Sequence, residues 1–356
     1  MKFLMRNLWN FALVFILVGA ILFGIAWHLG ARGGRLSIDD KGLHMEYIDL
    51  NHSSNAKIVV NEKNLNEFNS VKIKASSEDV RFIPSDYYGL EICTTKNTDD
   101  KPKWGIENGQ LNVETARDKG AIHFFDFNFM NFNYNENYIK IYYPKDASFK
   151  DIVVNLSSGD INLSKIKSEK LEIEVASGNI NADIDKCNVL TVSASSGDIK
   201  LSGTSVEKLN MNTTSGNIIS EIDDCANIVA SASSGDISIK NKRQLPASLN
   251  AKATSGSVNV SGEVWNSPKI ESSSGDITIS GDLKGNSNLE ATSGDVKIHL
   301  SGTISEYTYD LSASSGTIVL DREKFERQFL STGVSTSDNL IKVKTSSGDI
   351  TIEFKK

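Results

Sequence analysis

From residue 151 onward, apolar residues alternate with polar ones in short runs that stop and restart at a Ser-Gly pair. Before Gly178 the apolar positions include Leu171 and Ile173, and after it they resume at Ile180. Alternation with a period of two predicts β-strands with one buried face. The phase slips by one residue at the glycine, so we expect a corner or bulge there.

The Ser-Gly phrase, followed most often by Asp or Asn and then by Ile or Val, occurs ten times. Its glycines are Gly159, Gly178, Gly197, Gly216, Gly235, Gly256, Gly275, Gly294, Gly316 and Gly348. Most successive glycines are 19 residues apart, with single steps of 21, 22 and 32. A fixed period of this length indicates a solenoid. We therefore predict an all-β fold, a parallel β-solenoid (β-helix) of about ten 19-residue coils, right-handed, and preceded by one transmembrane helix.

The residues at the predicted corners have structural roles. Glycine suits a sharp corner because it adopts positive φ without steric cost. The residue after it can bond local backbone amides as an Asx turn, and five of these residues are Asp160, Asp198, Asp236, Asp276 and Asp349. Neutral residues separate most aspartates along the sequence, which limits repulsion between stacked coils. Calcium-binding repeats have a shorter, more acidic period, so no metal site is predicted here.

Residues 1–31 read as an N-terminal signal-anchor. Phe11 to Leu29 is a nearly unbroken apolar run, and no charge lies between Arg6 and Arg32. A run of that length as a helix spans the bilayer core. A cleaved signal peptide is the alternative, but the run is longer than an ordinary signal-peptide core. We expect the N-terminus inside, which makes the protein single-pass in the cell membrane with its C-terminal body extracytoplasmic.

The remaining segments are less regular. Residues 32–55 read as a polar linker, residues 56–150 as an irregular β capping region with decayed repeats, and residues 151–356 as the solenoid. In the clearest decayed repeat, Glu78 takes the place of the glycine. A short helix is predicted from Arg322 to Leu330, beside the last coil.

Aromatic residues interleaved with asparagine crowd the segment between His123 and Tyr143. A hairpin whose aromatic face closes the core is one interpretation. A partner-binding platform is the other, and its candidate residues are Phe127, Phe129, Phe132 and Tyr134.

Composition narrows the range of functions. The net charge of −7 disfavours nucleic acid as a partner. Serine occurs 8 times in residues 1–150 and 37 times in residues 151–356, so the two parts are built differently. We expect all three cysteines to be free, because Cys187 and Cys225 are 38 residues, or two coils, apart, which exceeds the reach of a disulfide.

The sequence offers no catalytic or metal-binding motif. Its five histidines are scattered, without His-Glu-x-x-His, and there is no Cys-x-x-Cys. Neither a Gly-x-Ser-x-Gly elbow nor a phosphate-binding glycine loop occurs. We therefore predict no enzyme activity and no cofactor.

The run from Tyr138 to Pro144, followed by the Ser-Gly-Asp-Ile repeats, resembles the LiaG-like putative adhesin family, bacterial proteins with β-strand repeats and no established activity. The resemblance covers about residues 56–356 and implies the fold, but it carries no functional residues. Glu78 in place of glycine departs from the repeat.

The leading hypothesis is a membrane-anchored surface protein, an adhesin or binding scaffold without catalysis. Its partners would be the membrane, through the N-terminal helix, and a cell-wall polymer or surface protein. An envelope-stress accessory that regulates a membrane sensor is the first alternative, and a carbohydrate-active β-helix enzyme is the second. Ice binding would need two uniform outward rows, and only the Ser/Thr row two residues before each glycine is uniform.

Overall fold

The computed structural model describes residues 34–39, 42–47, 57–94, 101–115, 122–126, 137–330 and 338–355. The chain forms two compact units, one from Met1–Asn55 with Asp118–Asn135 and the other from Ala56–Arg117 with Glu136–Lys356. The predicted anchor, residues 1–31, lies outside the described residues. Within the described ranges, no helix is both long and apolar enough to span a bilayer.

The smaller unit contains a three-stranded antiparallel sheet in the order β2-β1-β9. Its strands are β1 (Gly34–Asp39), β2 (Gly42–Tyr47) and β9 (Ile122–Asp126). Both β1 and β2 fall in the segment 32–55 that the sequence analysis assigned to a linker. Their apolar residues alternate, as at Leu36 and Ile38 or Leu43 and Met45, and this short-range alternation favours strands.

The larger unit is all-β, and its 22 strands belong to one hydrogen-bonded sheet. The first are β3 (Lys57–Lys63), β4 (Ser70–Ala75), β5 (Asp79–Ser85), β6 (Gly89–Thr94), β7 (Lys103–Glu107), β8 (Gln110–Glu114), β10 (Tyr138–Pro144), β11 (Phe149–Ser158), β12 (Ile161–Ser177), β13 (Ile180–Ser196) and β14 (Ile199–Ser215). The others are β15 (Ile218–Ser234), β16 (Ile237–Asn241), β17 (Ala247–Ser255), β18 (Val258–Ser274), β19 (Ile277–Lys284), β20 (Asn286–Ser293), β21 (Val296–Ser301), β22 (Thr308–Leu320), β23 (Glu323–Leu330), β24 (Leu340–Ser347) and β25 (Ile350–Lys355). Among the described residues, helix is confined to one 3-10 turn, η1 (Ile304–Glu306).

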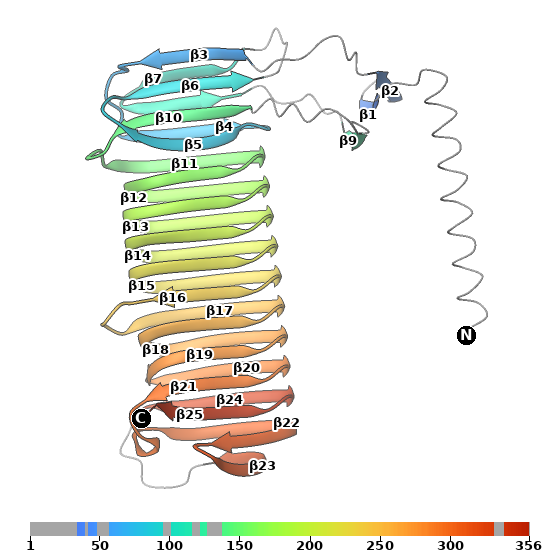
Figure 1. Ribbon diagram of the computed structural model, residues 1–356, viewed down its shortest axis with the longest axis vertical. Coiled ribbons are helices and arrows are strands. Elements are labelled where there is room, and N and C mark those ends of the chain that lie inside the picture. Colours follow the sequence, from blue (N-terminus) through green and yellow to red (C-terminus); the bar gives the residue numbers. More distant parts are fainter. Residues whose placement is uncertain are drawn as a thin grey trace, which may run out of the picture. The chain divides into compact units, whose positions relative to one another are not determined.

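Equivalent residues of successive repeats stack in register, and the strands are parallel (Figure 1). Ile161 pairs with Ile180, and Ile180 pairs with Ile199. All three side chains are fully buried in one apolar core cluster. The predicted β-solenoid architecture is therefore confirmed as an all-β, solenoid-like fold. Each coil also bends midway between two glycine corners, but this bend does not interrupt the strand. Each of the strands β12 to β15 is 17 residues long and continues through it.

The repeat glycines form the corners, with φ between 113° and 155°. Such values are nearly exclusive to glycine. At Gly197, for example, a Cβ would overlap the carbonyl oxygen of Gly178, one coil before it. The backbones of adjacent corners thus approach too closely for any side chain.

The residue after each glycine forms a ladder along the solenoid. The Oδ1 atom of Asp160 accepts a hydrogen bond from the N–H of Asn179 at 2.7 Å, and Oδ1 of Asn179 accepts one from the N–H of Asp198 at 3.0 Å. The series continues through Asn217, Asp236, Ser257, Asp276, Asp295, Asp349 and Thr317. The expectation of a local Asx turn was wrong, because the side chains of this series from Asp160 to Asp349 accept from the backbone N–H of a neighbouring coil instead.

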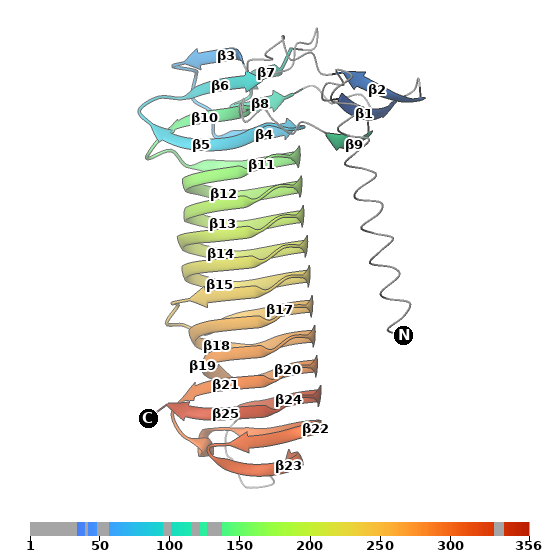
Figure 2. The same cartoon turned by 45° about the vertical axis from the view of Figure 1, so that its right-hand side comes forward.

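At the C-terminal end, the coils do not follow sequence order (Figure 1, Figure 2). β24 pairs with β20 on one side and with β22 on the other, and β25 likewise lies between β21 and β22. Stacking in sequence order, which the repeat spacing alone would give, therefore fails for the last repeat. Asp349 consequently stacks directly on Asp295, which already stacks on Asp276, so no neutral residue separates the three aspartates.

The predicted helix from Arg322 to Leu330 is also wrong, because this segment is β23. Asp321 and Arg322 both have positive φ, of 44° and 78°, and form a two-residue hairpin turn between Leu320 and Glu323. β23 pairs antiparallel with β22 and carries charged residues such as Lys324 and Glu326, which discourage pairing with other chains.

The N-terminal end has the mirror arrangement. On one side, the β4–β5 coil pairs with β8 and β10, and on the other side it pairs with β11 and β12. All four of these strands follow it in sequence. Glu78 occupies its corner and is 1% exposed. Its Oε2 accepts hydrogen bonds from the N–H of Ser77 at 3.0 Å and from Oγ1 of Thr115 at 2.8 Å. This carboxylate binds corner amides where the other coils have glycine.

The ladder predicts opposite effects for two isosteric exchanges. Asp295→Asn keeps the hydrogen-bond acceptor and removes like-charge repulsion, so it should raise the free energy of unfolding by roughly 0.5 kcal/mol. Asn217→Asp places a carboxylate between Asp198 and Asp236 and should lower it by a similar amount. Urea unfolding at low and high salt measures both. The two differences should shrink with salt, and salt-independent values would contradict the electrostatic explanation.

Candidate binding surface

Strand β10 presents a polar and aromatic face near the N-terminal end of the larger unit. Tyr138, Lys140 and Tyr142 are partly exposed, whereas Ile139 and Ile141 between them are fully buried. This follows from the alternation of side chains along a strand. The core thus fixes which side of β10 faces solvent.

Neighbouring strands add to the same face. β6 runs antiparallel to β10 and places Glu91 opposite Lys140. On the other side, β5 runs parallel and places Arg81 beside Lys140. Ring centroids of Tyr87 and Tyr142 lie 5.7 Å apart. We call Tyr87, Glu91, Tyr138, Lys140 and Tyr142 the tyrosine cluster.

Glu91 holds the cluster together. Its Oε1 accepts hydrogen bonds from the Tyr138 hydroxyl at 2.6 Å and from Nζ of Lys140 at 3.1 Å, and its Oε2 accepts one from the Tyr142 hydroxyl at 3.4 Å. Nζ of Lys140 also lies 3.9 Å from the centre of the Tyr138 ring, within cation–π range. Two tyrosines and a lysine are thereby fixed in position.

Protonation of Glu91 should disrupt this arrangement. Burial alone would raise the pKa of Glu91, but the hydrogen bonds from Tyr138, Lys140 and Tyr142 and the charge of Lys140 outweigh it and lower the pKa below 4.5. A lowered folded-state pKa gives stability that is complete above the unfolded-state value and is lost as pH falls through the folded-state value. Burial likewise raises the pKa of Tyr138 and of Tyr142.

The resulting prediction concerns Glu91→Gln. In the wild type, the contribution of Glu91 should be constant above about pH 4.5 and disappear below it, and Glu91→Gln should remove this part of the pH dependence. Urea unfolding between neutral and acidic pH measures the effect, with the exposed Glu107→Gln on β7 as the matched control. Identical pH profiles for wild type and Glu91→Gln would contradict the role given to Glu91.

A shallow hollow adjoins the cluster along β5, β12, β13 and β14. Its lining includes Arg81, Asn162, Asn181, Asp183 and Lys200. Nδ2 of Asn181 donates to Oδ1 of Asn162 at 3.4 Å, so the amides of successive coils form a short ladder. Amides, a carboxylate and two cations beside tyrosine rings can hydrogen-bond a polar partner along several coils.

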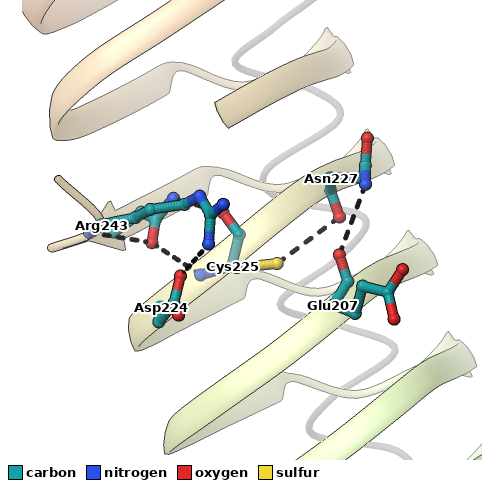
Figure 3. A network of polar contacts seen from close by, with 6 residues as sticks. Glu207, Asp224, Cys225, Asn227 and Arg243 are labelled. Carbon is teal, nitrogen blue, oxygen red and sulfur yellow. Dashed lines mark hydrogen bonds and ion pairs between the residues drawn. The ribbon is translucent and has the colours of Figure 1, made fainter. Parts of the chain in front are cut away.

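A second polar network lies where the 21-residue coil between Gly235 and Gly256 meets the coil before it (Figure 3). Asn241 is 2% exposed, and its Oδ1 and Nδ2 bond the N–H and carbonyl of Cys225 at 3.1 and 2.9 Å. Arg243 pairs with Asp224. The network closes the bend around residues 242–246, so its role is structural. Burial raises the pKa of Cys187 to about 11 and that of Cys225 to about 12.

The structure places the predicted residues as follows. The ten glycines and five aspartates lie along the corner ladder. Phe127, Phe129, Phe132 and Tyr134 lie outside the described residues. Cys93, Cys187 and Cys225 are buried and free. In the described part of the chain, no group of acidic, histidine or cysteine side chains is arranged to hold a metal.

Sequence reasoning missed Tyr87, Glu91 and Arg81. Glu91 and Tyr138 are 47 residues apart in the chain, and the antiparallel pairing that joins them interrupts the repeat. The alternation Tyr138, Lys140, Tyr142 was the available signal, because it already placed these three side chains on one face.

A family model described as Toastrack DUF4097 matches residues 68–280 and residues 264–353. Among solved structures, a "putative adhesin" from Bacteroides fragilis is 16% identical, covers 83% of this chain and 97% of its own, and has a TM-score of 0.38. A "putative cell adhesion protein" from Clostridium sporogenes is 11% identical, covers 84% of this chain and 100% of its own, and has a TM-score of 0.19. No curated protein matches the chain.

Proposed function

The chain belongs to the Toastrack DUF4097 family, in agreement with the resemblance seen in its repeats, and from that premise we propose that it is a surface-binding scaffold. Residues 1–31 anchor it in the cell membrane, its body is extracytoplasmic, and it acts by binding rather than by catalysis. The apolar run from Phe11 to Leu29 supports the anchor.

The tyrosine cluster is the observation that carries this proposal. Tyrosine and arginine are enriched among the residues that dominate binding energy at protein interfaces. Here Tyr138 and Tyr142 are held by Glu91 before any partner arrives. A preset surface loses less conformational freedom on binding than a mobile one. We therefore assign the partner as a protein of the cell surface.

The solenoid adds stiffness to this surface. Every corner in the regular part is tied to the next by a main-chain bond, such as that from Gly178 N–H to the Ser196 carbonyl at 2.9 Å, and by the side-chain ladder. Strands β5, β10 and β12 are therefore supported by a continuous hydrogen-bonded stack.

Titration of the full chain in lipid nanodiscs with isolated surface proteins and with cell-wall preparations tests the proposal. The double substitution Tyr87→Ala and Tyr142→Ala should weaken binding of the protein partner at least tenfold. Asn210→Ala with Asn212→Ala, on exposed positions of β14, is the matched control and should bind as the wild type does. Binding only to the cell-wall polymer would replace the partner assigned here. Equal binding by the cluster variant and the control, or no binding to either preparation, would refute the proposal.

Regulation of a neighbouring membrane sensor is a second candidate, favoured by one specific observation. β1 begins at Gly34, soon after the predicted span, and pairs with β9, which lies in sequence between β8 and β10 of the body. The segment that follows the predicted span is thus paired with β9 inside the smaller unit, and β9 is joined along the chain to the larger unit at both of its ends. Replacing residues 1–31 by an unrelated span should abolish regulation but leave binding by the tyrosine cluster intact.

A further inference from the structure

We propose that the level between β20–β21 and β22 is an acceptor slot for a strand-corner-strand segment. In one chain, residues 338–355 fill it, and the same segment of a second copy can fill it in exchange. This interaction surface is separate from the tyrosine cluster and does not depend on the proposed binding function.

The slot pairs with its occupant on both sides. Val343 of β24 stands opposite Leu289 of β20 and opposite Leu311 of β22. Ile350 of β25 stands opposite Val296 of β21 and Ile318 of β22. The occupant therefore satisfies two parallel strand edges at once, as in strand-addition complexes, where main-chain bonds supply affinity.

The corner of the slot selects its occupant. A Cβ on Gly348 would overlap the carbonyl oxygen of Gly294, so only glycine fits. Oγ1 of Thr345 donates to that same carbonyl at 3.0 Å. The N–H of Asp349 donates to Oδ1 of Asp295 at 2.9 Å, and Oδ1 of Asp349 accepts from the N–H of Thr317 at 2.7 Å. The slot thus makes a specific contact with each of the three residues, Thr345, Gly348 and Asp349.

The flanks of the segment add burial and charge pairing. Ile341, Val343, Ile350 and Ile352 are fully buried. On the outer surface, Lys342 pairs with Asp310 at 3.7 Å, and Nδ1 of His299 lies 3.3 Å from the carboxylate of Glu353. At the entry, Oδ1 of Asn339 accepts from the N–H of Gly285 at 3.0 Å. A second copy supplies the same side chains and makes the same contacts.

Sequence order makes this segment exchangeable. Residues 338–355 follow both neighbouring levels in the chain, so the segment can leave without drawing either neighbour along with it. β22 has an equivalent corner, since a Cβ on Gly316 would overlap the carbonyl of Gly348 just as one on Gly348 would overlap Gly294. β22 can therefore pair with β20 when residues 338–355 have left the slot. This pairing lowers the free-energy cost of releasing the segment. Exchange of an identical element between copies is a recognised route to dimers.

A nicked protein tests the slot directly. A protease site is introduced within residues 331–337 of the full chain, cut after folding, and the product is incubated with a labelled synthetic peptide of residues 338–356. We expect the label to enter to a limit of one peptide per chain. A peptide with Gly348→Val should bind at least tenfold more weakly. The proposed slot would be contradicted if the nicked protein took up no peptide below its temperature of global unfolding, or if it took up both peptides equally.

The second-copy occupant is tested on intact chains. Two differently tagged full chains are unfolded and refolded together at high concentration, and mixed dimers are captured through both tags in sequence. We expect mixed dimers with the wild-type segment and a strong reduction with Gly348→Val in both chains. Circular dichroism of that variant verifies that the remaining coils still form. Monomers alone from the wild type would overturn exchange between copies.

Discussion

Replacing Gly216 with alanine should lower the free energy of unfolding by about 2–4 kcal/mol. Gly216 has φ of 144°, a conformation that side chains resist. A Cβ there would also overlap the carbonyl oxygen of Gly197 and lie 3.2 Å from the N–H nitrogen of Asp198. Both atoms belong to the backbone of the neighbouring coil, so relief requires separating two stacked corners.

Equilibrium urea unfolding measures this loss. Gly105→Ala in β7 is the matched control, because no atom lies within 4 Å of its would-be Cβ. That variant should be unchanged or slightly more stable, since alanine restricts the unfolded chain. A Gly216→Ala variant as stable as Gly105→Ala would contradict the close approach of the corners.

Replacing Trp265 with alanine should cost about 3–5 kcal/mol. Trp265 is fully buried, and its Nε1 donates to the Ser280 carbonyl at 3.1 Å. It stands opposite the small Ala247 on one neighbouring coil and opposite Leu283 on the other. Removal of the indole leaves a cavity between parallel strands that have little freedom to collapse.

The same unfolding experiment, with Leu245→Ala as control, tests this prediction. Leu245 is 62% exposed, and its truncation should change stability by less than about 0.5 kcal/mol. Comparable losses for the two variants would mean that Trp265 does not fill the interior at this level.

The regular part of the fold was predictable because its signals are local and repeated. The corner glycines, such as Gly197, and the alternating residues around them specify the bend, the strand phase and the stacking partner. The ladder was predicted with the wrong partner, because an Asp or Asn side chain can bond either a local amide or an amide of a neighbouring coil. Only the stacking distance decides that Asp160 bonds Asn179.

The strand order at neither end of the larger unit was predictable from the repeats alone. The glycine spacing gives the order of coils along the chain, but the position of Gly348 between Gly294 and Gly316 depends on which edges remain unpaired. The tyrosine cluster depends on similar non-local pairing, since β6 reaches β10 through an antiparallel contact. Residues 322–330 have helix-compatible composition, and the hairpin turn at Asp321 overrides it.

Disulfide trapping in the C-terminal coils tests the central claim most directly. The pairs are Glu290→Cys with Lys344→Cys, which stand opposite each other, and Glu290→Cys with Ser312→Cys, which are separated by the inserted coil. Strand spacing puts the first pair about 4.8 Å apart and the second about 9.6 Å apart, and a disulfide needs less than about 7 Å between Cα atoms. Ser193→Cys with Asn212→Cys, opposite each other in the regular stack, is the positive control. We predict rapid cross-linking of the first pair and the control, and none of the second. Cross-linking of positions 290 and 312 instead would show that the coils stack in sequence order and contradict the inserted coil.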